Sequence, residues 1–172
     1  MPRLSRLACC AAAVLFGCRS TNPIAPAESQ LPAFEAQGWG PETPGFNLEV
    51  ILRGDNGGFG LVSFRQPNDD ALVINLGTWV RNLTPNTEYQ LQRAVDVTLD
   101  GECTSTAWLT LGKGTVPQTI LTDGSGSGRE ELFRSVAAFP VGSTFDIHFR
   151  VIEAGSGAAA LASGCYQFVI SQ

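Results

Sequence analysis

The segment TFDIHFRVI, residues 144 to 152, decides the fold because its side chains alternate strictly between apolar and polar. The alternation gives an apolar row of Phe145, Ile147, Phe149 and Val151 and a polar row of Asp146, His148 and Arg150. A period of two is typical of a β-strand with one buried face and one exposed face. We therefore expect residues 144–152 to form a half-buried strand that carries its polar row at the surface.

The same pattern recurs from residue 46 to the C-terminus, and turns containing Gly, Asn, Asp or Pro separate its repeats. Short alternating segments at this spacing predict an all-β fold, an antiparallel β-sandwich of about 8 to 9 strands. The expected strands are 48–53, 60–66, 71–80, 88–99, 104–111, 118–122, 129–136, 144–152 and 162–171. The alanine run at 158–160 has glycines nearby on both sides, which favours a loop.

One turn adds a family resemblance to this prediction. The stretch LTPNTEYQL, Leu83 to Leu91, resembles the Leu-x-Pro-x-Thr-x-Tyr corner of fibronectin type III and related immunoglobulin-like domains. The resemblance covers only these residues and implies an immunoglobulin-like form of the sandwich. It also implies that the hydroxyl of Tyr89 bonds back to the backbone of the turn before it.

The N-terminus has the pattern of an export signal. Arg3 and Arg6 precede an apolar run, Leu7 to Gly17, that is too short to span a membrane. The end of this run, Leu15-Phe16-Gly17-Cys18, resembles the lipobox of bacterial lipoproteins, Leu-x-Gly-Cys. The alternative is an ordinary signal cut after the APA at 25–27, with an incidental cysteine at 18.

The lipobox resemblance implies that residues 1–17 are removed and that Cys18 carries the lipid anchor. Arg19 follows Cys18 in place of the Asp that, in this family, favours retention in the inner membrane. In a host with two membranes we therefore expect an exported protein anchored in the outer membrane. Residues 18–45, which are rich in proline, are expected to form a tether, and residues 46–172 the β-sandwich domain.

The cysteine count agrees with export. The chain has five cysteines, of which Cys9 and Cys10 lie in the signal and Cys18 at the lipobox. Cys103 and Cys165 remain, and an even pair in an exported protein predicts a disulfide. The competing reading is two free thiols or two metal ligands, but no CxxC motif supports it.

Composition excludes several kinds of function. The formal net charge is −5 and Lys113 is the only lysine, so binding of nucleic acid through a basic surface is not expected. His148 is the only histidine, so the sequence lacks the ligands of a blue-copper or multi-histidine zinc site. No nucleophile elbow accompanies it, and the GSGSG at 124–128 fits a hairpin loop better than a phosphate loop. We expect no cofactor and no metal.

Four residues make up the candidate binding surface: Trp108, Asp146, His148 and Arg150. Trp108 shares its predicted strand face with threonines, which indicates exposure and suits stacking on a sugar ring or an apolar partner. The alternative is that the tether or a neighbouring loop covers Trp108. Arg93 interrupts an apolar face, either because a β-bulge turns it outward or because it is buried and paired.

These observations favour a lipid-anchored protein of the cell envelope with a non-catalytic binding or structural role. Its partners would be the membrane, through the anchor, and a glycan or an envelope protein. The alternative is a carbohydrate-active envelope enzyme that uses paired carboxylates, about 5 to 9 Å apart. Acidic residues in the predicted turns leave Ca²⁺ binding open as well.

Overall fold

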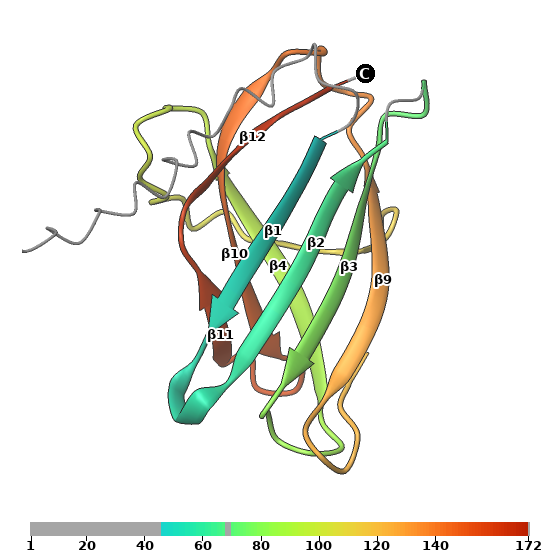
Figure 1. Ribbon diagram of the computed structural model, residues 1–172, viewed down its shortest axis with the longest axis vertical. Coiled ribbons are helices and arrows are strands. Elements are labelled where there is room, and N and C mark those ends of the chain that lie inside the picture. Colours follow the sequence, from blue (N-terminus) through green and yellow to red (C-terminus); the bar gives the residue numbers. More distant parts are fainter. Residues whose placement is uncertain (1–45, 68–69, 172) are drawn as a thin grey trace, which may run out of the picture. The chain divides into compact units, whose positions relative to one another are not determined.

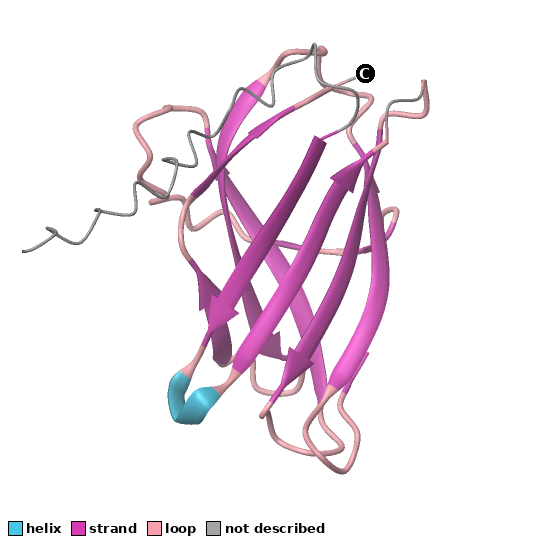
Figure 2. Ribbon diagram, viewed as in Figure 1, coloured by secondary structure: helices cyan, strands magenta, loops and turns pink. Residues whose placement is uncertain are grey.

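The computed structural model describes residues 46–67 and 70–171. These residues form strands and loops and one short 3-10 turn, η1 (Asp55–Gly57) (Figure 2). The strands are β1 (Phe46–Arg53), β2 (Phe59–Gln66), β3 (Val73–Arg81), β4 (Glu88–Asp96), β5 (Leu109–Thr110), β6 (Gly112–Lys113), β7 (Val116–Pro117), β8 (Ile120–Leu121), β9 (Gly128–Ser135), β10 (Thr144–Glu153), β11 (Ala159–Ser163) and β12 (Tyr166–Val169). The fold is therefore all-β, as predicted.

Some sequence predictions lie outside the described residues. They are the signal at 1–17, the tether at 18–45 and the lipidation of Cys18. Within the described residues, no helix has the length and apolar character needed to cross a membrane.

All twelve strands belong to one sheet, ordered β5-β4-β10-β11-β1-β2-β3-β9-β6-β7, with β12 paired to β10 and β8 paired to β4. In Figure 1, β1, β2, β3 and β9 run side by side in front of β4 and β10. The strand β11 pairs with both β10 and β1, so it joins these two faces along one side. The result is a barrel-like arrangement around a shared interior.

A short segment joins the faces on the other side. Its strand β5 pairs with β4, and after Leu111 its strand β6 pairs with β9 through the parallel bridge Lys113–Phe133. The backbone N–H of Leu111 donates to the carbonyl of Leu91 at 2.8 Å. Residues 109–113 therefore cover part of the two edges that β4 and β9 would otherwise expose, and the sheet nearly closes on itself.

The predicted sandwich of two separate antiparallel sheets is thus not the arrangement found. Nearly all the pairs are antiparallel, but the β6–β9 pair is parallel and makes the sheet mixed. Alternation in the sequence reports which side of a strand is buried, not which strand lies next to it. Residues 104–111 were predicted as one strand, but only Leu109–Thr110 pair as β5 because the chain turns there to cross between the faces.

The register places one side of each long strand in a common core. On β10, Ile147, Phe149 and Val151 are buried, as the alternation predicts. The ring of Phe64 on β2 lies edge-on to Phe149 at 6.0 Å and to Phe168 of β12 at 4.8 Å. The two faces of the barrel therefore interdigitate through aromatic side chains.

Local details confirm one turn prediction and correct another. The Tyr89 hydroxyl accepts a hydrogen bond from the N–H of Thr84 at 3.1 Å, as the corner motif implies. The alanine run predicted as a loop instead contributes to β11, whose Leu161 is buried. The backbone of Gly54 approaches the alanine run closely, since a Cβ on Gly54 would lie 2.1 Å from the carbonyl oxygen of Ala160. Small side chains therefore suit both segments.

Candidate functional site

The interior of the barrel contains a cavity of about 440 Å³ at the end where β4 and β9 finish and β10 begins. This volume is typical of sites for small molecules. Phe64, Leu76 and Phe149, all buried, belong to its wall. The remaining lining residues are Ile74, Arg93, Val95, Val97, Leu111, Arg134, Ser135, Val136, Ala138, Phe139, Phe145, Ile147, Phe168 and Ile170. The wall is thus mostly aliphatic and aromatic, with two arginines.

Arg93 is the first charged group of the cavity. The pairing of β4 with β10 runs without interruption from Asp96 to Tyr89, so no bulge turns Arg93 outward. It keeps the inward position between Leu91 and Val95, half-buried, and lines the cavity. Within residues 46–67 and 70–171, no acidic side chain forms an ion pair with its guanidinium. The bulge alternative is therefore wrong, whereas the inward, partly buried position of the other alternative is found without the expected pairing.

The environment of Arg93 disfavours its charge. Burial lowers the pKa of the Arg93 guanidinium below its usual value, and the charge of Arg134 lowers it further. Arginine nevertheless stays protonated under ordinary conditions. A positive charge that is partly removed from water and has no counter-ion is favourably placed to bind an anion.

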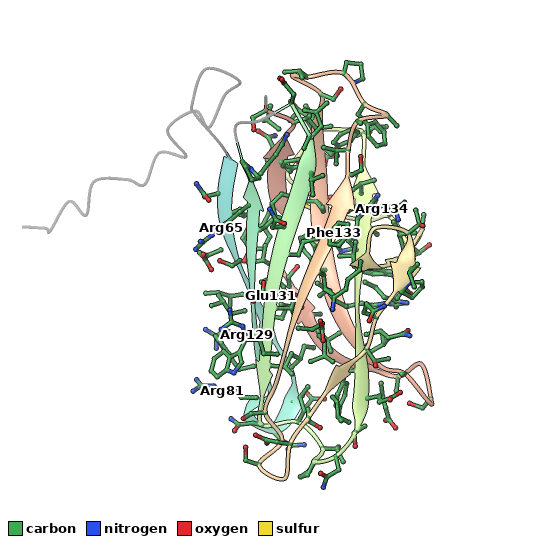
Figure 3. All side chains as sticks on the ribbon, turned by 90° about the vertical axis from the view of Figure 1, so that its right-hand side faces the viewer. Arg65, Arg81, Arg129, Glu131, Phe133 and Arg134 are labelled. Carbon is green, nitrogen blue, oxygen red and sulfur yellow. A yellow bond between two sulfur atoms is a disulfide. The ribbon has the colours of Figure 1, made fainter. Side chains whose placement is uncertain are left out.

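Arg134 supplies the second charge, from β9. Its Nη1 donates to the carbonyl of Gly114 at 3.2 Å, in the turn between β6 and β7. In Figure 3, Arg134 lies beside this hairpin, next to Phe133. Gly114, in the turn that directly follows the crossing at 109–113, therefore positions Arg134. Because the carbonyl of Gly114 is neutral, this bond does not compensate the charge of Arg134.

Two of the apolar side chains that line the cavity are exposed. Val97 is 80% exposed and Phe139 is 44% exposed, and both line the cavity. Leu99 and Val141, nearby in the sequence, are 51% and 41% exposed. Exposed apolar side chains at a cavity are typical of sites that exchange apolar ligands with a membrane or a partner.

The predicted binding surface lies elsewhere, on the outside of β4 and β10. Trp108 stacks on His148, with ring centroids 4.6 Å apart, and the Arg150 guanidinium lies 4.1 Å from the centroid of the Trp108 ring. Arg150 Nε also donates to Gln92 Oε1 at 2.7 Å. The fold brings Trp108, His148 and Arg150 together as expected, but they contact one another, and Trp108 is half-buried.

The fourth predicted residue, Asp146, is 1% exposed and was expected at the surface. Its Oδ2 accepts a hydrogen bond from the N–H of Gly101 at 2.9 Å, because the loop between β4 and β5 folds over this strand. His148 Nε2 lies 3.0 Å from the carbonyl oxygen of Ser105 in the same loop. Asp146 and His148 therefore hold this loop on β10.

A disulfide ties down the same loop. Cys103, within it, is bonded to Cys165, which lies between β11 and β12, as the cysteine count predicts. The bridge joins residues separated by 62 positions in the sequence. The competing prediction of free thiols or metal ligands is therefore wrong, and among the described residues no cluster of three or more His, Cys, Asp or Glu side chains could hold a metal ion.

The loop at 123–128 binds an internal carboxylate. Asp123 Oδ1 accepts hydrogen bonds from the Ser125 hydroxyl at 2.6 Å and from the N–H groups of Ser125 and Ser127 at 2.8 and 3.0 Å. These bonds lower the pKa of Asp123. A phosphate has no place in this arrangement, because the loop already directs its donors at its own side chain.

Sequence reasoning identified Arg93 as anomalous but missed Arg134 and the cavity. The signal was present in β9, where Arg134 lies between Leu132 and Val136 at inward positions of the alternation. Two charged residues on inward faces of different strands are the pattern that would have indicated a site.

Comparison with protein-family models, with curated proteins and with solved structures gave no match.

Proposed function

We propose that this protein is a non-catalytic binding protein of the cell envelope, and that its cavity binds an amphiphile with an apolar body and an anionic head group. The observation that carries the proposal is an apolar cavity lined by two arginines that form no ion pair with any acidic side chain of residues 46–67 and 70–171. The apolar wall would take the body of the ligand through the hydrophobic effect. A carboxylate or phosphate would receive charge-assisted hydrogen bonds from Arg93 and Arg134.

The envelope location rests on the sequence. The lipobox resemblance at Cys18 and the export signal before it support an exported, lipid-anchored protein, in the outer membrane where the host has two. An anchored protein is held where amphiphiles are concentrated, which suits a cavity with exposed apolar side chains in its lining. The disulfide between Cys103 and Cys165 agrees with an oxidising compartment.

The alternative of a carbohydrate-active enzyme finds no support in this cavity. A glycosidase needs two carboxyl groups on either side of the scissile bond. The lining residues in the described part of the chain include neither Asp nor Glu. The cavity thus offers groups that hold an anion, and it offers no acid–base pair.

A ligand series tests the proposal directly. Dodecanoate, dodecyl phosphate, dodecanol and dodecyltrimethylammonium share one apolar body and differ in head-group charge. Titration calorimetry below the micelle concentration should show binding of the two anionic ligands, weaker binding of the alcohol and none of the cation. Arg93→Gln and Arg134→Gln should each weaken anion binding, whereas Arg65→Gln, on the exterior, should not. Equal binding of the cation, or no effect of either cavity variant, would contradict the proposal.

A further inference from the structure

A second feature lies on the outer face of the sheet, away from the cavity. Across β2, β3 and β9, the register aligns Leu61 with Trp79 and Arg129, and the next outward row aligns Ser63 with Gly77 and Glu131. Figure 3 shows Arg65, Glu131, Arg129 and Arg81 along one side of the sheet. These strands therefore present a patterned surface of aromatic, charged and hydroxyl groups.

Gly77 contributes no side chain to this surface, and it lies in the wall of a hollow. A hollow of about 480 Å³ lies over Gly77, with Trp79 and Asn75 next to it along β3 and Ser63 and Glu131 on either side. The Glu131 carboxylate lies close to Gly77: a Cβ there would be 3.0 Å from Glu131 Oε2, so a side chain at this position must displace the flexible end of Glu131. Glycine weakens the interior of a strand, and it often marks a place where another molecule approaches the backbone.

Trp79 lines the hollow and, with its neighbour Phe59, forms an aromatic wall. Trp79 is 36% exposed, and the ring of Phe59 meets it edge-on at 6.0 Å. The Arg81 guanidinium lies 4.8 Å from the Phe59 ring centroid and 5.4 Å from that of Trp79. These cation–π contacts orient Arg81 beside the hollow without neutralising its charge.

The charges on this face do not cancel. Arg129 bonds Glu131 at 2.7 Å, and Arg65 lies 3.6 Å from Glu49. In the described part of the chain, Arg53 and Arg81 contact no acidic side chain, and Arg53 lies 5.8 Å from the Phe59 ring centroid. On a chain whose formal net charge is −5, this face therefore carries an excess of two positive charges beside its aromatic wall.

We propose that the hollow over Gly77 binds an acidic oligosaccharide, a glycan that carries uronate carboxylates. The exposed part of the Trp79 ring offers an apolar surface for a sugar ring. The Ser63 hydroxyl donates to Glu49 at 2.6 Å and can still accept from a sugar hydroxyl, while Asn75 supplies donors and acceptors and Glu131 supplies acceptors. Arg81 and Arg53 attract the carboxylates of the neighbouring sugar units. This site is separate from the cavity and does not depend on the function proposed for it.

Three probes applied to the purified full chain test this inference. Oligogalacturonate is the acidic glycan, its methyl ester is the neutral counterpart, and poly-glutamate is a polyanion without sugar rings. Calorimetry should show binding of the first, and binding of the other two should be weaker by about tenfold or more. The decisive variant is Gly77→Thr, which fills the hollow with a residue that favours strands. It should abolish glycan binding while the melting temperature stays the same or rises.

Matched variants separate the contributions. Trp79→Ala should weaken binding by about tenfold, and Arg81→Gln should reduce both the affinity and its dependence on salt. Gln90→Thr, which introduces the same residue on β4, is the control and should bind like the unmodified protein. The proposal is overturned if oligogalacturonate does not bind, if the ester or poly-glutamate binds equally well, or if Gly77→Thr binds normally. Dodecanoate binding should be unchanged in every one of these variants.

Discussion

Replacement of Arg93 by Met should make the free protein more stable and its ligand complex less stable. Arg93 points into an apolar cavity, and burial together with Arg134 lowers the pKa of its guanidinium. Its charged form is therefore disfavoured in the folded state relative to the unfolded state. Because arginine is protonated at every working pH, this destabilisation is present throughout the range from about pH 5 to 9.

The magnitude follows from the environment. Replacement of buried ionic groups by well-packed apolar residues of similar volume is often neutral or stabilises a protein by about 1–4 kcal/mol. Arg93 is only half-buried and keeps part of its hydration, so we expect a gain of about 1–2 kcal/mol in the free energy of unfolding. For a domain of this size, each kcal/mol corresponds to roughly 4 °C in melting temperature.

With an anionic ligand bound, the unmodified protein should become more stable than Arg93→Met. An anionic amphiphile at a concentration of about 100 times its dissociation constant stabilises the unmodified protein by about 2.7 kcal/mol. The variant lacks one of the two charges that we propose hold the head group, and it should gain much less. Thermal unfolding followed by circular dichroism, with and without dodecanoate, measures both effects in one experiment.

An exposed arginine provides the control. Arg65 lies on the exterior and is paired with Glu49, so Arg65→Met should change stability by less than about 0.5 kcal/mol and leave the ligand effect intact. A loss of more than about 1 kcal/mol in Arg93→Met would show that Arg93 supports the fold instead of a ligand. Equal stabilisation of both proteins by dodecanoate would refute the assignment of the head-group site.

Four further predictions concern the anchor, the disulfide and the loop at 123–128. Cys18→Ala should release the protein from the membrane fraction of cells, and a variant that stays membrane-bound would exclude the lipid anchor. Simultaneous replacement of Cys103 and Cys165 by Ala should cost about 4 kcal/mol, because the bridge spans 62 positions, and denaturant unfolding with and without reductant measures this. Gly126→Ala should cost more than about 2 kcal/mol in the same assay, since φ is +76° and the new Cβ would lie 2.1 Å from a backbone oxygen. Because the pKa of Asp123 is lowered, its hydrogen bonds stabilise the loop above about pH 4, and this stabilisation is lost as pH falls through the folded-state pKa. Hydrogen exchange of the loop amides should show this loss, and Asp123→Asn should remove the pH dependence.

Much of the fold was predictable from local pattern. Alternation identified the long strands, and the buried side of β10 is the one that Phe145 to Val151 predicted. The cysteine count identified the disulfide, and the corner motif identified the bond between Tyr89 and the turn. These features depend on the period of a strand, on redox compartment and on contacts between residues near in sequence, all of which a sequence expresses directly.

The outer face of β10 was not predictable from strand alternation alone. Trp108, His148 and Arg150 do lie together, but the loop that carries Trp108 folds onto β10 and lets them satisfy one another. Asp146 is buried for the same reason. Strand alternation assigns a side chain to one face of a sheet, and it cannot report whether a distant loop covers that face.

The sequence by itself determined the long strands, the buried apolar side of β10 and the disulfide. Only the tertiary structure decided that the strands form one nearly closed sheet, because the crossing at 109–113 depends on pairing between residues far apart in the chain. That closure brings Arg93 of β4 and Arg134 of β9 to the same cavity. Each arginine alone is an irregularity in a strand pattern, and only the tertiary structure shows that both line the same apolar cavity.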